Sequence, residues 1–242
     1  MIIFIRGHIR NSFNDKGLYN LIKSIIKFHK TDIKIYIHTW NIYSSNLSWR
    51  KIEKNKRNVN PSIINHYFQD LSSYIKNIII EDDTKIDIKG KVAGNICSTK
   101  CPLLGWKNMW HGIYTGIDYI NKNEDLNEYV IHTRFDILSN SFSQFFDKII
   151  TFIHATRNIT EFDKNKFLIN VNSNNHNINN IRGIDNFYIG NVKTMYMLIS
   201  HFYNNLDDIV LKYPKNRCQE YLVYLENNYI FDNTLLIKEL TI

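Results

Sequence analysis

The chain has 242 residues, of which 44% are hydrophobic and 14% aromatic, and its formal net charge is +7. That length and apolar content are ample for one sizeable core, so we expect a single domain over residues 1–242. The positive charge suits phosphorylated ligands, nucleic acid or anionic surfaces without selecting among them, and a merely soluble basic surface explains it as well.

The cysteines and the apolar runs bear on the compartment. Cys97, Cys101 and Cys218 are an odd and sparse set, which argues against a disulfide scaffold and for a reducing compartment. Cys97, Cys101 and His111 would be half of a zinc site, and no fourth ligand stands at a sensible spacing. No apolar stretch approaches about 18 residues, and the first residues lack the charge order of a signal peptide. We therefore expect a cytoplasmic protein with no membrane span.

The first 40 residues predict a strand, a helix and a second strand. The run IIFI at 2–5 is β-branched and aromatic and ends at Arg6-Gly7, so it reads as a buried strand, and so does IKIYIHTW at 33–40. Between them, residues 18–26 place leucine and isoleucine at spacings of three and four, which predicts an amphipathic helix. This order predicts parallel pairing with a right-handed crossover.

The middle of the chain continues the alternation. Residues 49–61 read as a polar, basic connector, and residues 77–83 as a third strand that ends in carboxylates. Residues 89–105 have no period and predict an unusually long loop. A strong helix with an apolar stripe over 106–120 follows, and YVIHTRFDIL at 129–138 predicts the next strand.

The last third predicts a polar loop at 170–180, a strand at 185–191 and a helix at 192–202. A final helix at 217–228 and a strand at 229–237 close the chain. Strands that alternate with helices predict the α/β class, here a Rossmann-type, mostly parallel sheet flanked by helices.

Polar side chains gather where the predicted strands end. They are Arg6, His8 and Arg10; His38, Thr39 and Trp40; Glu81, Asp82 and Asp83; and Arg134 and Asp136. Ligands of open α/β sheets bind outside the carboxyl ends of the strands, so these residues predict one pocket for a charged ligand with a flat ring. Alternatively, these polar residues simply end the strands in solvent and form no binding site. No P-loop, G-x-G-x-x-G, G-x-S-x-G or H-E-x-x-H pattern is present.

Several of these stretches, taken in order, resemble the nucleotide-sugar-dependent glycosyltransferases of the GT-A fold, especially polysaccharide and lipopolysaccharide enzymes of bacteria and large viruses. The stretches are IFIRGHIRNS, IHTWN, the helix and strand that end in HTRFD, then IDNFYIGNVKTMYML, and NRCQEYLVYL. The resemblance spans most of the chain. It implies a GT-A-like fold, a nucleotide-sugar donor and a glycan acceptor.

The resemblance also implies site residues. The nucleotide-sugar would contact Arg6, Gly7, His8, Arg10, His38, Thr39, Trp40 and Arg134, with Trp40 or His38 as flat contacts for the base. Asp136 would hold a divalent metal or sugar hydroxyls. Asp185 is the first candidate for the general base and Glu220 the second, although a loop or capping role for Asp185 and a first-turn role for Glu220 stay open.

One departure from the family concerns the metal. The usual signature carries two carboxylates, D-x-D, whereas this chain has Thr133-Arg134-Phe135-Asp136, with one carboxylate and one arginine. Mg²⁺ or Mn²⁺ could be held by one aspartate and the diphosphate, because these ions keep several waters. Alternatively, Arg134 could neutralise the diphosphate itself, since a guanidinium pairs bidentately with phosphate.

Two rival functions come from other classes. A nucleic-acid-binding module is suggested by the net charge of +7 and by RKIEKNKR at 50–57, but most aromatic residues fall at core positions, so no nucleic-acid partner is expected. Another nucleotide-dependent α/β enzyme, such as a methyltransferase or phosphotransferase, would normally carry a glycine-rich first turn. A glycosyltransferase-like protein without activity also stays open.

Overall fold

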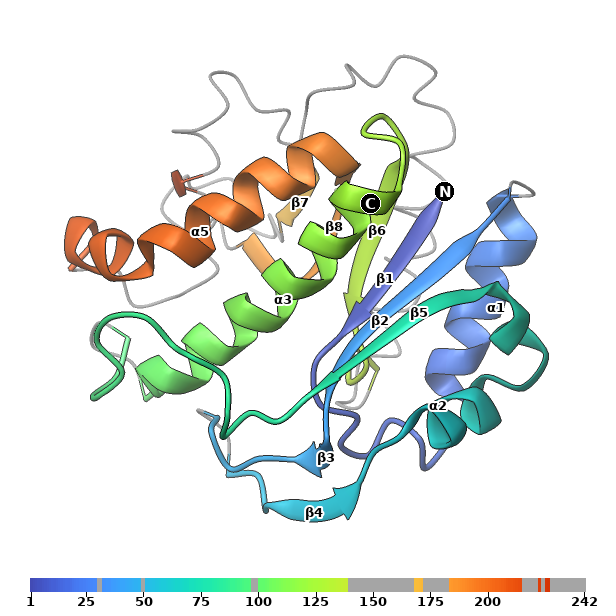
Figure 1. The fold of residues 1–242 in the computed structure, drawn as a ribbon, viewed down its shortest axis with the longest axis horizontal. Coiled ribbons are helices and arrows are strands. Elements are labelled where there is room, and N and C mark those ends of the chain that lie inside the picture. The colour runs from blue at the N-terminus through green and yellow to red at the C-terminus, as the bar shows by residue number, and fades with distance from the viewer. Residues whose placement is uncertain are drawn as a thin grey trace.

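The structure is a computed structural model that describes residues 1–29, 32–48, 51–96, 100–138, 168–171, 183–214, 222, 225 and 226. Its centre is a six-stranded sheet in the order β5-β2-β1-β6-β8-β7 (Figure 1). The strands, in that order, are β5 (Ile75–Glu81), β2 (Lys34–Trp40), β1 (Ile2–Arg6), β6 (Tyr129–Arg134), β8 (Gly183–Asn191) and β7 (Leu168–Val171).

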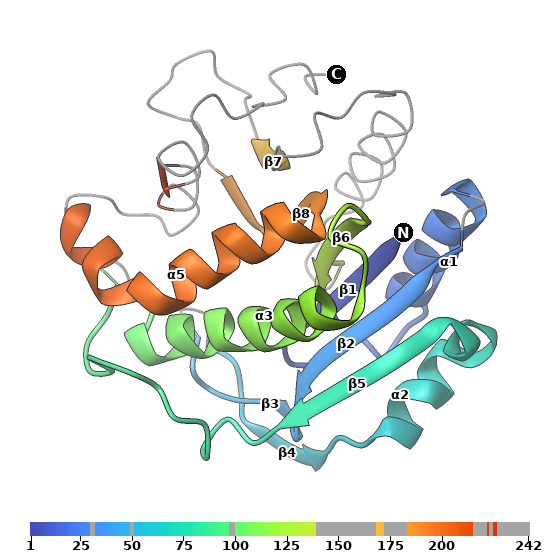
Figure 2. The ribbon, with the colours of Figure 1, turned by 45° about the horizontal axis from the view of Figure 1, so that its top comes forward.

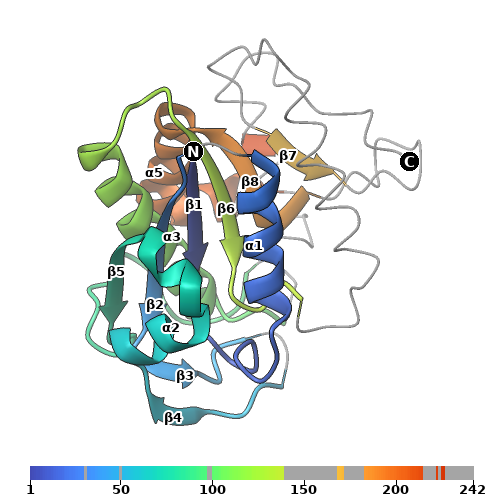
Figure 3. The ribbon, with the colours of Figure 1, turned by 90° about the vertical axis from the view of Figure 1, so that its right-hand side faces the viewer.

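The sheet is mixed and mostly parallel. β5, β2, β1 and β6 run in parallel, β8 pairs antiparallel with β6, and β7 pairs antiparallel with β8. A separate antiparallel hairpin, β3 (Ile42–Ser44) with β4 (Asn55–Asn58), lies beyond the carboxyl ends of the parallel strands (Figure 3). The predicted α/β class with a mostly parallel sheet is confirmed.

Helices cover both faces of the sheet (Figure 2). α1 (Gly17–His29), α2 (Pro61–Phe68) and the 3-10 helix η1 (Gln69–Tyr74) pack on one face, and α3 (Leu103–Asn123) and α5 (Val192–Lys212) pack on the other. β1 serves both cores because successive side chains of a strand point to opposite faces. Ile3 and Ile5 join the first core, and Ile2 and Phe4 the second.

Asparagine caps fix the beginnings of two helices. The Asn60 side chain accepts a hydrogen bond from the Ile63 amide at 3.1 Å, and Pro61 occupies the first turn of α2. The Asn191 side chain accepts from the Thr194 amide at 2.8 Å at the start of α5. Both caps satisfy amides that a helix leaves without an internal partner. The abundant asparagine is therefore structural at these two positions.

The predicted elements over 2–5, 18–26, 33–40, 77–83, 106–120, 185–191 and 192–202 are confirmed, with shifted ends. The connector at 49–61 is corrected, because it contains β4 and is followed by α2 and η1. The strand at 129–138 is also corrected. β6 ends at Arg134, and residues 135–138 form a turn that brings Asp136 back beside Arg134. Most of the predicted elements at 170–180 and 217–237 lies outside the described residues.

The predicted long loop between β5 and α3 is confirmed, and α5 holds it in place. The Asp207 carboxylate accepts a hydrogen bond from the Lys91 amide at 3.0 Å and pairs with the Lys107 ammonium at 2.7 Å. Lys107 also donates to the Lys89 carbonyl at 2.8 Å. Across the described ranges, no helix is long and apolar enough to cross a membrane.

Gly116 lets α3 lie directly on β1, which gives a first prediction. A Cβ added at Gly116 would lie 2.1 Å from Cζ of the fully buried Phe4 ring. Gly116→Ala is therefore expected to lower the free energy of unfolding by about 1–3 kcal/mol through overpacking, although alanine normally stabilises a helix. Chemical denaturation measures the change. The exposed Asn123→Ala on the same helix is the control, and a Gly116→Ala protein as stable as that control would contradict the prediction.

Candidate functional site

The carboxyl ends of four parallel strands bring the predicted polar residues to one edge of the sheet. In the strand register, Arg6 lies beside His38 on one side and Arg134 on the other, and Trp40 lies beside Glu81. The prediction that these strand ends converge is confirmed. We call this group of residues the rim.

The turn after β1 returns the chain to the rim. Gly7 has φ of +97°, a left-handed conformation that glycine adopts without steric cost. Its amide donates to the His38 carbonyl at 3.1 Å, and its carbonyl accepts from the Thr39 hydroxyl at 2.9 Å. Gly7 and Thr39 thus tie β1 to β2, and the turn carries His8 and Arg10 alongside the strand ends.

A carboxylate clamped between two guanidinium groups forms one half of the rim. Arg134 Nε donates to Asp136 Oδ1 at 2.7 Å and Arg134 Nη2 to Asp136 Oδ2 at 2.6 Å, while Arg10 Nη1 also donates to Asp136 Oδ2. Burial by itself raises the pKa of Asp136, but the charges of Arg134 and Arg10 outweigh it and hold that pKa well below its usual range. Asp136 is therefore ionised at any physiological pH.

Arg6 makes a contact that the sequence did not predict. Its Nε donates to His132 Nε2 at 3.2 Å, and both residues are buried. Because arginine can only donate, Nε2 of His132 must be the unprotonated ring nitrogen. Burial, followed by the charges of Arg6 and Arg134, lowers the pKa of His132 well below its usual value. A neutral imidazole therefore holds the guanidinium of Arg6 in a buried position at the end of β1.

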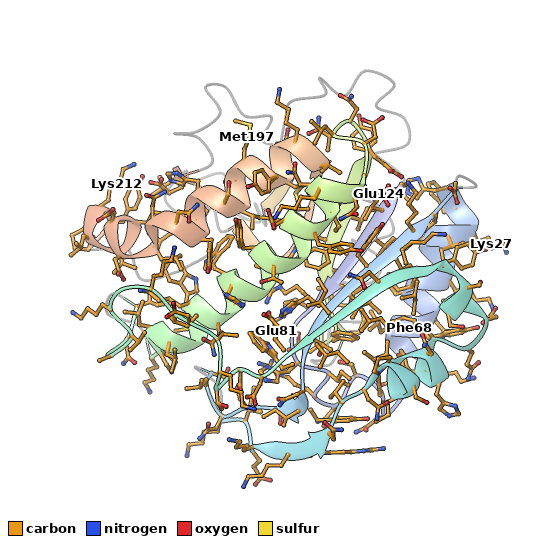
Figure 4. All side chains as sticks on the ribbon, viewed as in Figure 1. Lys27, Phe68, Glu81, Glu124, Met197 and Lys212 are labelled. Atoms are coloured by element: carbon orange, nitrogen blue, oxygen red, sulfur yellow. The ribbon has the colours of Figure 1, made fainter. Side chains whose placement is uncertain are left out.

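The other half of the rim is a carboxylate between two imidazoles, labelled at Glu81 in Figure 4. Glu81 Oε2 lies 2.7 Å from His38 Nε2 and 3.0 Å from His111 Nε2. Burial raises the pKa of Glu81, yet hydrogen bonds from His111 and His38 outweigh it and lower this pKa to about 2. Its side chain keeps 26% exposure, so the cluster presents a fixed negative charge to solvent.

Trp40 packs inside this cluster. Its ring stacks on His111 at 6.3 Å between centroids, and His38 and His8 lie against it at 5.1 Å and 5.8 Å. Trp40 is only 3% exposed and His38 is fully buried. Both side chains therefore form the buried part of the rim, and neither offers an open face for a base in this structure.

His8 and Asp83 connect the two halves. His8 Nε2 lies 3.7 Å from Asp83 Oδ2, and the Asp83 side chain is 4% exposed. Burial is the largest cause that lowers the pKa of His8, and the nearby carboxylate of Asp83 acts in the opposite direction. Asp82 turns away, since its carboxylate accepts from Thr84 and pairs with Lys85.

A pocket of about 730 Å³ opens beside the clamped carboxylate. Arg10 and Asp136 line it from the rim, and the hairpin segment contributes Lys51, Lys54 and Lys56. The sequence predicts only a polar, basic connector for the segment that carries those lysines. A basic run gives no local signal of the partner it will face, so only the folded arrangement places it beside Arg10.

The two predicted catalytic residues, Asp185 and Glu220, both lie in the last third of the chain. Asp185 lies in β8, and Phe187 pairs with Thr133 in the antiparallel register of β8 and β6. The backbone of Asp185 is therefore at the end of the sheet where β6 finishes. Glu220 lies outside the described residues.

The residues of the rim do not fit a divalent ion held by Asp136. Both carboxylate oxygens already accept from guanidinium groups, and three arginines surround the one carboxylate, a set of charges that repels a cation. Within the residues placed by the structure, no group of three or more His, Cys, Asp or Glu side chains is arranged to hold a metal. Of the residues considered for a zinc site, Cys97 lies outside the described residues.

Comparisons with known proteins give one weak structural likeness. No family model and no curated protein matches the chain. Among solved structures, the chain is similar to a crystal structure of an active-site mutant of LgtC, with 10% identity, a TM-score of 0.46, and coverage of 94% of this chain and 69% of that one. A likeness that weak carries no argument about function, which has to come from the rim and the pocket.

Proposed function

We propose that the protein is a GT-A-like glycosyltransferase that moves a sugar from a nucleotide-diphosphate sugar to a hydroxyl of a glycan or other acceptor. One observation carries the proposal: Arg6, Arg10 and Arg134 surround a single carboxylate at the carboxyl edge of a mostly parallel sheet, beside a large basic pocket. Preorganised cations at this edge suit the negative charge of a diphosphate leaving group. The ordered motifs that resemble the family point the same way.

The chain's own residues account for the chemistry as follows. Arg10 and Arg134 face the diphosphate, and Asp136 orients both guanidinium groups and lies close enough to the pocket to accept from a sugar hydroxyl. When the acceptor oxygen bonds to the anomeric carbon, the bond to the diphosphate breaks and its electrons leave with the phosphate. The arginines stabilise that charge as it develops.

The acceptor hydroxyl must lose its proton, and Asp185 remains the first candidate to take it, with Glu220 second. Support for Asp185 comes from the β6–β8 register, which brings its backbone to the edge where Arg134 and Asp136 lie. A positioned carboxylate serves as a general base when it comes within hydrogen-bond reach of the hydroxyl. We further propose that residues 1–242 form one domain that works in the cytoplasm.

Ligand-dependent melting tests the proposal first. UDP or GDP at about 100 times its dissociation constant should raise the melting temperature by roughly 5 to 10 °C, whereas S-adenosylmethionine and a short RNA should not. Sugar transfer from the matching donor, followed by release of the nucleotide, would then establish the reaction. A shift with RNA alone that weakens in salt would favour the nucleic-acid rival.

Asp185→Asn tests the general base. The variant is expected to lose about 10²- to 10⁴-fold in kcat while its dissociation constant for the nucleotide stays the same, because only proton removal is affected. Asp208→Asn, at an exposed position on α5, is the control and should be fully active. If Asp185→Asn turns over normally, the assignment passes to Glu220.

A further inference from the structure

The pocket beside the rim has no role assigned by the motifs, and its lining suggests one. We propose that Arg10 and the hairpin lysines Lys51, Lys54 and Lys56 bind the donor's diphosphate in this pocket, with ammonium and guanidinium groups in place of a divalent metal. This inference rests on the proposed function and names the groups that would hold its donor.

The size and charge of the pocket carry the first step. Its volume of about 730 Å³ falls in the range of small-molecule sites. The lining includes four cationic side chains and two anionic ones, Glu53 and Asp136, which leaves an excess of two positive charges. A diphosphate diester carries one negative charge on each phosphate, so ligand and pocket match in charge without a further cation.

Hydrogen bonds tie the two sides of the pocket together. The Arg10 amide donates to the Tyr43 carbonyl at 2.7 Å, which joins the turn after β1 to β3. Ser44 Oγ donates to the Glu53 carbonyl at 2.7 Å and accepts from the Asn55 amide at 3.1 Å, which holds the lysine segment against β3. The spacing between Arg10 and the lysine segment is thus fixed by one backbone hydrogen bond and two hydrogen bonds of the Ser44 hydroxyl.

The third step concerns how β4 is held. Every residue of β4 is exposed, so burial of apolar side chains does not explain its position. Arg57 lies over the Tyr43 ring at 4.7 Å, and the Val59 amide donates to the Asn41 carbonyl at 2.8 Å. Pairing with β3 and the contacts of the neighbouring residues therefore keep β4 beside the rim, where its Lys56 lines the same pocket as Arg10.

The test measures binding of UDP, GDP and inorganic pyrophosphate by calorimetry in EDTA. Three proteins are compared: the wild type, Lys51→Gln/Lys54→Gln/Lys56→Gln, and a control, Lys27→Gln/Lys76→Gln/Lys193→Gln, whose exposed lysines lie elsewhere. Both variants lose the same charge. We expect binding by the wild type without metal, at least about tenfold weaker binding by the hairpin variant, and less than about twofold change in the control.

Two results would overturn the inference. One is nucleotide binding that requires Mg²⁺ or Mn²⁺, and the other is equal weakening by the hairpin and control variants. Failure of the proposed function looks different. Metal-free pyrophosphate binding that depends on the hairpin lysines, with no transfer from any nucleotide-sugar, would keep the anion pocket and remove the glycosyltransferase. Transfer with an unchanged donor KM in the hairpin variant would keep the glycosyltransferase and remove the hairpin lysines as its diphosphate site.

Discussion

Asp136→Ala is expected to lower the free energy of unfolding by about 3 kcal/mol and to abolish turnover. The Asp136 side chain is 5% exposed, and its removal leaves the guanidinium groups of Arg10 and Arg134 at the rim without their carboxylate. A loss of this size still leaves a typical domain folded, so activity and stability can be measured on the same sample. Chemical denaturation gives the first quantity and a transfer assay the second.

Asp118→Ala is the matched control, because it removes a carboxylate whose partner, Lys122, is 67% exposed. Its effect should stay within about 0.5 kcal/mol. If Asp136→Ala cost no more than this control, the clamp would not be a structural unit. If it were fully active, Asp136 would have no part in the site.

Acidification from pH 7 to pH 5 is expected to destabilise the protein steeply. Burial lowers the pKa values of His8, His38 and His132 in the folded state, so the unfolded chain takes up protons near pH 6.5 that the folded chain refuses. Stability is thus complete above the unfolded pKa. Below it, stability falls by up to about 1.4 kcal/mol per pH unit for each such histidine.

Glu81 extends the same trend to lower pH. Its folded pKa of about 2 lies below the ordinary value of 4.5, so the stability it contributes is present above pH 4.5 and is lost as the pH falls towards 2. The two effects have the same sign and succeed one another as acid is added.

Denaturation curves at pH 8, 7, 6 and 5 measure this dependence. In His132→Gln, the new amide oxygen can still accept from Arg6. This variant should reduce the slope of the unfolding free energy against pH by the contribution of about one bound proton. His66→Gln replaces an exposed imidazole on α2 and serves as the control. An unfolding free energy that does not change between pH 7 and pH 5 would contradict the prediction.

Part of the site can be predicted from single segments of the sequence. Each of these residues follows an apolar run, and the ends of parallel strands must meet at one edge of the sheet; they are Arg6, Arg10, Arg134 and Asp136. The contacts of His132 with Arg6 and of His111 with Glu81 are not predictable from the sequence. Nothing in the local pattern says which arginine or carboxylate a buried histidine will face, and Arg6 and His132 are separated by 126 residues.

The hairpin of β3 and β4 is a part of the fold that the sequence does not predict. β4 has no buried side chain, so the alternation that reveals a strand is absent, and its pairing with β3 depends on hydrogen bonds such as those of Ser44. The strand predicted over 129–138 likewise includes the turn at 135–138, because an apolar run does not show where a strand ends.

The sequence by itself determined the α/β class, the alternation of β1, α1 and β2, the helix over 106–120 and the gathering of charge at the strand ends. Hydrophobic periodicity is a local property, and it dictates which residues can be buried. The tertiary structure alone decided which charges meet: the clamp on Asp136, the imidazole pair on Glu81 and the lysines beside Arg10. Apart from the pair of Arg134 and Asp136, those contacts join residues far apart in the chain, and only the packing of the sheet and the hairpin sets their distances.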